Sequence, residues 1–360
     1  MSAPFPGLAG KLKSTYKAAL DHGSVLFTDS EVVELDDEAT GIPFEVRFAP
    51  ALANKPERKE EQPEASKDEA KEHFDPFAPP YQQDLFVVGD TVKEDAQDSG
   101  EELVVLLNKF CVTPRHFLLV TKEFVKQTTP LTPVELYAAW SILKQLGARE
   151  KHLAFLNCGA NSGASQPHKH LQFIPLSNGV APFDHFIDEH KPQNTKSPFQ
   201  LPLPYASFTA LLDIPPSGLA ADVATHLGER FLSCLDLMID HLRRLAEEDE
   251  ASNQSEHPSF RLSDLSYNVI LTQSYLHLVP RRAEKYTTSS GRDISVNSLG
   301  FAGMVLVKEQ EALDEIKQVG VLKVLESVGY RAVELGEAPN AHQIEADAEG
   351  DKENQPAASA

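Results

Sequence analysis

The stretch NCGANSGASQPHKHLQF, residues 157–173, decides how this chain is interpreted. It runs into a predicted strand over 168–176, in which alternate side chains share one face. His168, His170 and Gln172 therefore point the same way, at steps of roughly 7 Å along the strand. The small residues 159–165 predict a loop whose backbone N–H groups can approach phosphate oxygens. Together the two features indicate a phosphate held beside a nucleophile.

Histidine suits attack on phosphorus, because it is substantially neutral at pH 7 and its phosphoramidate divides one displacement into two easier steps. Gln172 cannot act as an acid or a base, but it can hydrogen-bond a non-bridging phosphate oxygen. Two other interpretations stay open. The pair His168 and His170 could belong to a metal site, although no further ligand lies nearby at a typical spacing. Both could also be surface histidines without a function.

The bulk composition excludes some classes of protein. The formal net charge of −21 argues against a general nucleic-acid binder. The acidic residues gather in segments 57–75, 90–102, 245–257 and 334–360, which leaves the rest nearly neutral and compatible with a polyanionic substrate. No apolar run approaches the roughly 20 residues of a membrane helix.

The cysteines and the N-terminus indicate an intracellular protein. Cys111, Cys158 and Cys234 are scattered and odd in number, so they favour core positions over a disulfide framework or a zinc site. The N-terminus lacks the apolar region of a secretory signal. The expected compartment is the cytoplasm, with the nucleus as a second one.

The remaining patterns predict an α+β fold with an antiparallel sheet and helices packed against it. One helix begins after Thr132, an N-cap with proline next and glutamate three residues on, and ends near Gly147. Another covers 219–246, where apolar residues recur at helical spacing. A helix pair covers 310–328, interrupted at Gly320. The predicted strands are 42–49, 85–89, 102–111, 116–122, 152–159, 168–176 and two parts of 267–282 on either side of Ser274.

The turns and charged segments between these elements, and the C-terminal tail, can also be interpreted. The turn VTPR joins 102–111 to 116–122 as an antiparallel hairpin. The charged segments around 57–75 and 245–258 are interpreted as solvated loops or frayed helices. The tail 336–360 is expected to be disordered and acidic.

At these residues the sequence resembles the transferase branch of the histidine-triad (HIT) superfamily. That branch includes galactose-1-phosphate uridylyltransferases and the fungal diadenosine tetraphosphate phosphorylases, also called ATP adenylyltransferases. The hydrolase branch has a third histidine where Gln172 stands here. The uridylyltransferases show HPHPQ, whereas Lys169, Leu171 and the loop SGASQPH (162–168) resemble the phosphorylases. Other resembling segments are PFEVRFAPALANKP (43–56), LLNKFCVTPRHFLLVTKEF (106–124), YNVILT (267–272), VPRR (279–282) and NSLGFAGMVLVK (297–308).

The resemblance implies an α+β, HIT-like antiparallel sheet with flanking helices, large insertions and a C-terminal extension domain. Residues 1–200 would form the HIT-like catalytic domain, with an acidic insert at 57–75. Residues 201–335 would form an ATP adenylyltransferase-like region that completes the fold, before the tail 336–360.

The resemblance also implies roles for individual residues. His170 would be the nucleophile that takes the adenylyl group, His168 would support its geometry, and Gln172 would hold the α-phosphate. The residues expected to bind the rest of the substrate are Ser162, Gly163, Ala164 and Ser165 around the phosphates, Asn157 beside the same phosphate, Lys55 at the polyphosphate, Asn108 near the adenosine, and Met304 and Lys308.

The implied reaction is reversible phosphorolysis of diadenosine tetraphosphate to ATP and ADP. A divalent cation, Mg²⁺, would enter with the polyphosphate, with no metal ligands from the protein and no organic cofactor. The expected partners are nucleotides and phosphate, without nucleic acid or membrane, and the chain is expected to be a monomer. The alternatives are a hexose-1-phosphate uridylyltransferase, a dinucleoside polyphosphate hydrolase, or a nucleotide-binding protein with a vestigial site.

Overall fold

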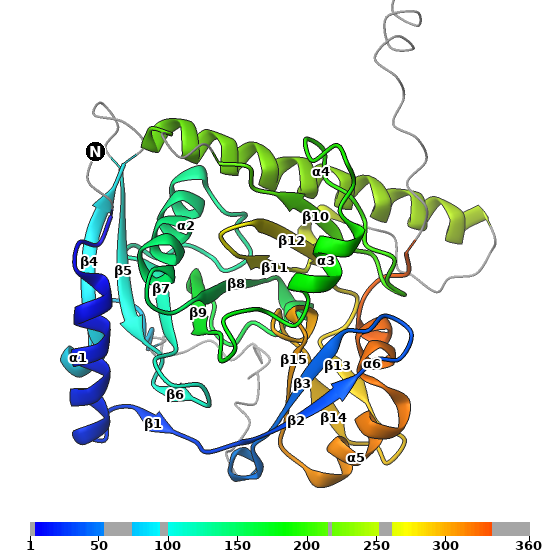
Figure 1. Cartoon of the computed structure of the whole chain (residues 1–360), viewed down its shortest axis with the longest axis horizontal. Helices are drawn as coiled ribbons and strands as arrows, with labels where there is room; N and C mark the ends of the chain where they lie inside the picture. Colours follow the sequence, from blue (N-terminus) through cyan, green and yellow to red (C-terminus); the bar gives the residue numbers. More distant parts are fainter. Residues whose placement is uncertain (1–3, 54–73, 94–99, 215–217, 252–260, 333–360) are drawn as a thin grey trace, which may run out of the picture.

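The computed structural model describes residues 4–53, 74–93, 100–214, 218–251 and 261–332 (Figure 1). An eight-stranded sheet forms its centre, in the order β10-β12-β11-β8-β9-β7-β5-β4, and all neighbouring strands are antiparallel. The strands are β4 (Phe86–Val92), β5 (Glu101–Leu107), β7 (Phe117–Thr121), β8 (His152–Cys158), β9 (His170–Pro175), β10 (Phe208–Leu211), β11 (Tyr267–Leu271) and β12 (Tyr275–Pro280).

Three helices, α1 (Leu8–Asp21), α2 (Pro133–Gly147) and α4 (Ala220–Ala251), pack with one face of this sheet into the larger hydrophobic core. Thr132 caps α2 as predicted, because its hydroxyl accepts from the Glu135 N–H while the Glu135 carboxylate accepts from the Thr132 N–H. The predicted apolar face of α4 is buried at Val223, Leu227, Phe231, Leu235, Met238 and Leu242.

A smaller sheet lies beside the opposite face of the large one and joins distant parts of the chain. Its order is β15-β3-β2, and β15 (Met304–Val307) pairs in parallel with β3 (Pro43–Phe48), which pairs antiparallel with β2 (Glu31–Asp36). The second core cluster lies between this sheet and the large one. The remaining elements are β1 (Leu26–Phe27), β6 (Phe110–Cys111), α3 (Asp184–His190), β13 (Lys285–Thr287), β14 (Asp293–Ser295), α5 (Gln310–Val319) and α6 (Val321–Val328).

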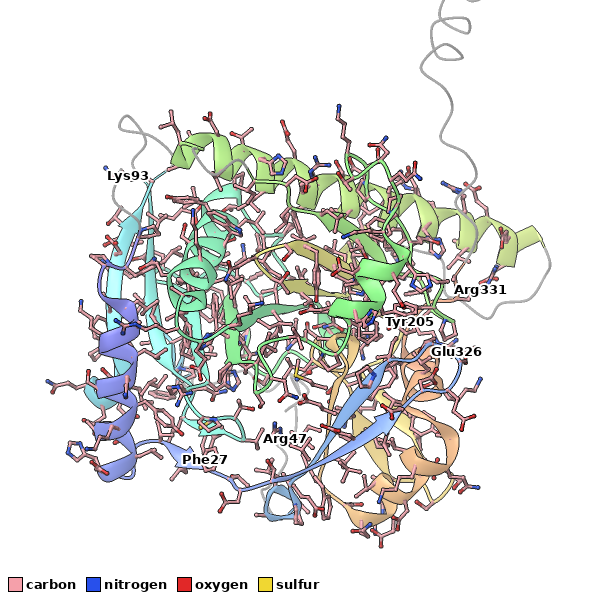
Figure 2. The ribbon with its side chains drawn as sticks, viewed as in Figure 1. Phe27, Arg47, Lys93, Tyr205, Glu326 and Arg331 are labelled. Carbon is pink, nitrogen blue, oxygen red and sulfur yellow. The ribbon has the colours of Figure 1, made fainter. Side chains whose placement is uncertain are left out.

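The end of the described chain packs back onto its middle. Tyr205 forms an antiparallel bridge with Arg331 (Figure 2), and the Ala206 N–H donates to the Tyr330 carbonyl at 2.8 Å. His241 of α4 bonds the Arg331 carbonyl through Nε2 at 2.9 Å. Both halves of the chain therefore contribute to one connected body.

The predicted α+β class with an antiparallel sheet is confirmed, and so are the 102–122 hairpin, the strand pair around Ser274 and the helix pair around Gly320. Among the helices that the structure describes, none combines the length and the apolar composition needed to cross a bilayer. The tail 336–360 and most of the insert 57–75 lie outside the described residues.

Three predicted boundaries are wrong. The strand over 102–111 ends at Leu107, because Asn108 Oδ1 accepts from the Phe110 N–H in a local turn and the Lys109 carbonyl accepts from the Leu26 N–H. The strand over 168–176 begins at His170. The segment from residue 245 continues α4 to Ala251, since Leu245 is buried in the core. The sequence analysis did not anticipate α1, α3, β1, β2, β10, β13, β14 and β15.

Lys169, between the two motif histidines, points to the α2 side of the sheet. Its side chain is buried, and Nζ lies 2.5 Å from Glu135 Oε2 and 2.8 Å from the Pro130 carbonyl oxygen. The same Glu135 oxygen accepts from the Thr132 N–H at 2.8 Å. The back of the motif is therefore bonded to the capping box of α2.

Replacing Lys169 with methionine is expected to lower the free energy of unfolding by about 3 kcal/mol, because the buried Glu135 carboxylate loses its counter-ion. Urea denaturation of the two proteins measures the difference. The double variant Lys169→Met/Glu135→Gln is the control, since glutamine keeps the capping box but carries no charge. It should recover most of the loss, and an equal or larger loss in the double variant would contradict the explanation.

Candidate functional site

His170 begins β9 with its tautomer set by the chain itself. Its Nδ1 lies 2.8 Å from the His168 carbonyl oxygen, so Nδ1–H donates and the lone pair remains on Nε2. Burial lowers the pKa of His170 to about 4, although the hydrogen bond to the His168 carbonyl acts in the opposite direction. The ring is therefore neutral at pH 7 with a nucleophilic nitrogen, and no described residue bonds to Nε2.

His168 is held differently, with a protein partner at each ring nitrogen. Nδ1 lies 2.7 Å from Asp75 Oδ2, and Nε2 lies 2.7 Å from the Thr121 carbonyl oxygen and 3.1 Å from the Thr121 hydroxyl oxygen. Because groups of the protein occupy both nitrogens, neither is available to a metal, which argues against the alternative interpretation of His168 and His170 as a metal pair.

The segment around Asp75 covers this face of the sheet. The Phe77 ring lies 4.9 Å from the His170 ring and 6.1 Å from the His168 ring, centroid to centroid. Phe77 and Tyr81 also pack on the small apolar cluster Val104, Leu106, Leu118 and Val120, which shares the histidine face. The predicted common face of His168, His170 and Gln172 agrees with these contacts, although His168 itself precedes the strand.

Gln127 bonds to backbone groups of both β8 and His170 of β9 at the point where the two strands separate and no longer pair with each other. Its Oε1 accepts from the His170 N–H at 2.8 Å, and its Nε2 donates to the Asn157 carbonyl at 2.7 Å. Its own backbone N–H donates to the Pro167 carbonyl at 2.7 Å. The buried amide therefore opens the sheet beside the nucleophile without leaving its backbone groups unpaired.

The small-residue loop folds tightly behind the nucleophile. Gly159 and Gly163 have φ values of 92° and 79°, and a Cβ on Gly159 would lie 2.5 Å from the Leu265 carbonyl oxygen. Ser162 is buried, with its hydroxyl donating to the Gly159 carbonyl at 2.6 Å. In the part of the chain that the structure describes, the backbone N–H groups of Ala164 and Ser165 have no acceptor. The predicted contact of this loop with phosphate stays a prediction.

Asn157 is committed to holding that loop. Its Oδ1 accepts from Asn268 Nδ2 at 3.0 Å, from the Ser298 hydroxyl at 2.7 Å and from the Ser298 N–H at 2.9 Å. Asn268 also donates to the Ser162 carbonyl at 2.9 Å. Only 2% of Asn157 is exposed, so its contacts are to loop-supporting groups; the predicted contact to phosphate stays a prediction.

Arg281 anchors this network. The buried guanidinium donates to the Asn268 Oδ1 at 2.5 Å and to the Val296 carbonyl at 2.8 Å, and it lies over the Phe301 ring. Burial lowers its pKa to about 9, which leaves it charged at neutral pH. Because its hydrogen bonds are made to groups inside the protein, Arg281 supports the loop and does not face a substrate.

Gln172 bonds to His116, whose other ring nitrogen bonds to Asn108. Asn108 is therefore part of the support of Gln172, and its predicted contact with the adenosine stays a prediction. Met304 and Lys308 lie in and directly after β15, on the small sheet, and no described contact joins either to His170. Lys55 lies outside the described residues.

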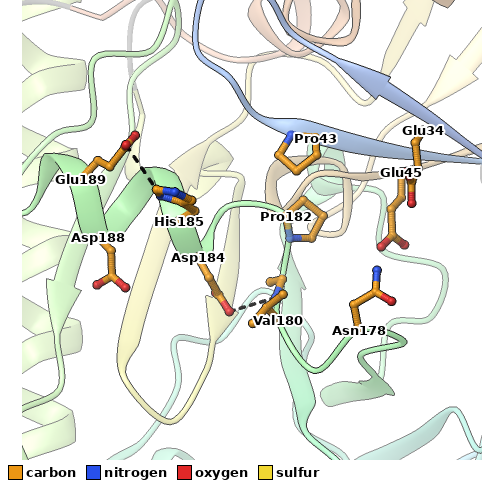
Figure 3. A pocket seen from close by; sticks show the side chains of 11 residues that line it. Glu34, Pro43, Glu45, Asn178, Val180, Pro182, Asp184, His185, Asp188 and Glu189 are labelled. Atoms are coloured by element: carbon orange, nitrogen blue, oxygen red, sulfur yellow. Dashed lines mark hydrogen bonds and ion pairs between the residues drawn. The ribbon is translucent and has the colours of Figure 1, made fainter.

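A pocket of about 690 Å³ lies elsewhere, between β3 and α3 (Figure 3). Glu34 and Glu45 face Asn178 and Val180 across it, and α3 adds further carboxylates. This lining would repel a polyphosphate, and it contains no residue of the histidine motif. Within the described ranges, no three His, Cys, Asp or Glu side chains come together to hold a metal ion. The three cysteines are buried free thiols, as predicted.

The structure adds supporting residues that the sequence analysis missed, namely Asp75, Phe77, His116, Thr121, Gln127, Asn268, Arg281 and Ser298. One signal was available for His116, Thr121, Asn268, Arg281 and Ser298, since each lies in a segment that resembles the phosphorylases. For the others no signal in the sequence connects them to the motif.

Comparison with known proteins identifies the family of the chain. The family described as "Ap4A phosphorylase N-terminal domain" matches residues 5–187, and "ATP adenylyltransferase C-terminal domain" matches residues 201–331. Diadenosine 5',5'''-P1,P4-tetraphosphate phosphorylase 2 of Saccharomyces cerevisiae is 32% identical over 332 residues, covering 86% of this chain and 90% of that protein.

Two solved structures match over nearly their whole length. The crystal structure of yeast Ap4A phosphorylase Apa2 is 30% identical, with a TM-score of 0.69, and the match covers 93% of this chain and 98% of that one. The structure of Apa2 in complex with Ap4A has a TM-score of 0.67 at 30% identity, covering 91% and 99%. This chain is a member of the Ap4A phosphorylase family of nucleotidyltransferases.

Proposed function

We propose that this protein converts diadenosine tetraphosphate (Ap4A) and phosphate to ATP and ADP through an adenylyl-His170 intermediate. The observation that carries the proposal is the bond from His170 Nδ1–H to the His168 carbonyl, which leaves the Nε2 lone pair for attack. The similarity of this chain to a phosphorylase whose crystal structure contains Ap4A supports the choice of substrate.

The reaction consists of two displacements at one phosphorus. In the first, His170 Nε2 bonds to the α-phosphorus while the bond to the leaving ATP oxygen breaks. In the second, an oxygen of inorganic phosphate attacks the same phosphorus, the P–N bond breaks, and ADP forms as Nε2 regains its lone pair. ATP is a good leaving group without protonation, which fits the presence of Gln172 where the hydrolases have a third histidine.

Groups already described can stabilise the negative charge that develops on the phosphoryl oxygens. The Gln172 amide and the free N–H groups of Ala164 and Ser165 can donate to phosphoryl oxygens as negative charge develops on them. His168 lies behind the nucleophile, where Asp75 and Thr121 hold its ring in place. No group has to move a proton at the moment of attack.

The test is to incubate the purified chain with Ap4A and Mg²⁺, with or without inorganic phosphate, and to separate the nucleotides. ATP plus ADP formed only with phosphate supports the phosphorylase. AMP plus ATP formed without phosphate would identify a hydrolase. Turnover only with uridine nucleotides and sugar phosphates would identify a uridylyltransferase, and no turnover with either would favour a vestigial site.

We further propose that Mg²⁺ arrives bound to the polyphosphate, as is usual where a protein offers few carboxylates. Chelation by EDTA should stop turnover, and the Mg²⁺ concentration that restores it should follow the substrate concentration. We propose a monomer, because every support of the site described above comes from one chain; sedimentation velocity tests this. The proposed compartment is the cytoplasm, with the nucleus second, which fits the three free thiols and is tested by imaging the tagged chain.

A further inference from the structure

Three hydrogen bonds in series lead from the backbone of β6 to Gln172. The Phe110 N–H donates to Asn108 Oδ1 at 3.1 Å. Asn108 Nδ2 lies 3.1 Å from His116 Nδ1, and His116 Nε2 lies 3.1 Å from Gln172 Oε1. The series ends at an amide that shares its face of the sheet with His170.

The direction of each bond follows from the first. A backbone N–H can only donate, so the Asn108 oxygen must face Phe110 and its NH₂ group must face His116. Asn108 Nδ2 is closer to His116 Nδ1, at 3.1 Å, than to His116 Nε2, at 3.4 Å, so we assign Nδ1 as the acceptor, which places the ring proton on Nε2. That proton donates to Gln172 Oε1, and the Gln172 NH₂ group is the part of the amide left to face a ligand.

His116 is suited to this role because it stays neutral. Only 8% of the residue is exposed, and burial lowers its pKa to about 4. A second proton would put a donor against the Asn108 NH₂ group, which is itself a donor. The ring also packs near Phe155, with centroids 6.2 Å apart, so it has a fixed position.

We propose that Asn108 and His116 are positioning residues that hold the Gln172 amide with its NH₂ group toward the α-phosphate. The proposal rests on the proposed function for the identity of the ligand. An amide in the opposite orientation would turn its carbonyl oxygen to the phosphoryl oxygens and repel them. The orientation therefore determines whether Gln172 stabilises or destabilises the negative charge of the transition state.

The first test is a pair of variants at His116. His116→Phe keeps the ring and its packing but removes the donor, and it should lower kcat for phosphorolysis roughly 30-fold, near the range for losing one donor to a developing charge. His116→Gln offers an NH₂ group close to the lost Nε2–H and should retain most of the wild-type kcat. If both variants lose the same activity, or only KM changes, the positioning role is wrong.

The second test reverses the direction of the series. Asn108→Asp keeps the acceptor for the Phe110 N–H and the size of the side chain, but its carboxylate also accepts at His116 Nδ1. Neutral His116 then carries its proton on Nδ1, and Gln172 turns round to donate to the bare Nε2. We expect kcat to fall about tenfold or more at pH 8, where the ring is neutral.

The same variant should recover as the pH falls. The introduced carboxylate favours a doubly protonated His116, which again donates to Gln172 Oε1. The ratio of variant to wild-type kcat should therefore rise about tenfold from pH 8 to pH 6, with near-ultraviolet circular dichroism showing the fold intact at both. A constant ratio, or a change in KM alone as expected if Asn108 simply contacted the adenosine, would overturn the proposal.

Failure of the proposed function can be distinguished from failure of the positioning role. Wild-type turnover of Ap4A tests the function by itself. The ¹⁵N resonances of His116 report the tautomer in the protein without substrate, whatever its reaction. We expect a protonated Nε2 and an unprotonated Nδ1 in the wild type, and the reverse in Asn108→Asp at pH 8. Any other pattern would contradict the proposed directions of the three hydrogen bonds.

Discussion

Replacing His170 with alanine is expected to lower kcat for Ap4A phosphorolysis by roughly 10,000-fold or more, because the covalent route disappears with its nucleophile. None of the neighbouring side chains offers a substitute. Groups of the protein occupy both ring nitrogens of His168 and Gln172 has no nucleophilic atom, so neither is available to form a bond to phosphorus. Nucleotide separation after timed incubation measures the loss.

The covalent intermediate can be observed directly, in addition to the change in rate. Incubating the wild-type protein with Ap4A and no phosphate should add one AMP to the protein, detected by mass spectrometry at alkaline pH, where a phosphoramidate survives. His185→Ala is the matched control, since His185 is an exposed histidine on α3 and should leave both rate and adduct unchanged. An adduct that persists in His170→Ala, or that maps to another residue, would refute the assignment.

Acid is expected to unfold the protein before it protonates the site. Burial lowers the pKa of His116 and His170 to about 4 and that of His277 to about 3, against 6.5 for an exposed histidine. Above pH 6.5 folded and unfolded chains hold these rings equally neutral. Below it only the unfolded chain takes up the protons, so stability falls until the pH reaches the folded values. Three such groups remove roughly 5 kcal/mol between pH 7 and pH 5.

That loss is comparable with the whole stability of many domains. Urea denaturation at half-unit steps from pH 7.5 to pH 5 should show a slope that approaches about 4 kcal/mol per pH unit. His277→Gln should reduce the slope of unfolding free energy against pH by the contribution of about one proton. His185→Ala should not change the slope, because His185 is exposed in the folded chain. A flat profile across this range would show that these rings are not buried as neutral groups.

Local signals in the sequence accounted for a large part of the fold and for the centre of the site. The capping box after Thr132 and the apolar spacing on α4 are properties of neighbouring residues, so they could be interpreted without the rest of the chain. The alternation His168, Lys169, His170 also placed the outer two on one face and Lys169 on the other, where it meets Glu135.

The supports of the site depend on contacts between residues far apart in the sequence. Asp75 and Gln127 reach the motif from segments that carry no chemical pattern of their own, and their identity becomes meaningful only beside His168 and His170. The boundary error at Asn108 has the same origin. Its side chain accepts from the Phe110 N–H, and the next carbonyl, of Lys109, bonds to the distant Leu26, so the chain leaves the strand after Leu107.

Asn157 shows that a residue chosen by resemblance can make contacts that the sequence does not predict. The resemblance implied a phosphate ligand, and its side chain does lie at the small-residue loop. Three donors occupy its Oδ1, however, and they come from Asn268 and Ser298 in the C-terminal half. No local pattern can predict such a connection, because it forms only when β8 and β11 become neighbours in the sheet.

The bonds from Asn268, Arg281 and Ser298 to the loop beside His170 have a consequence for the timing of synthesis. A ribosome releases the nucleophile and its loop long before it releases the residues that brace them. The pairing of β3 with β15 forms later still, because β15 is the last described strand. Pairings between such distant segments form slowly, and strand edges stay unpaired until then. The nascent chain is therefore expected to lack the bracing of its site for most of its translation, and a premature stop before Ser298 should yield protein without a working site.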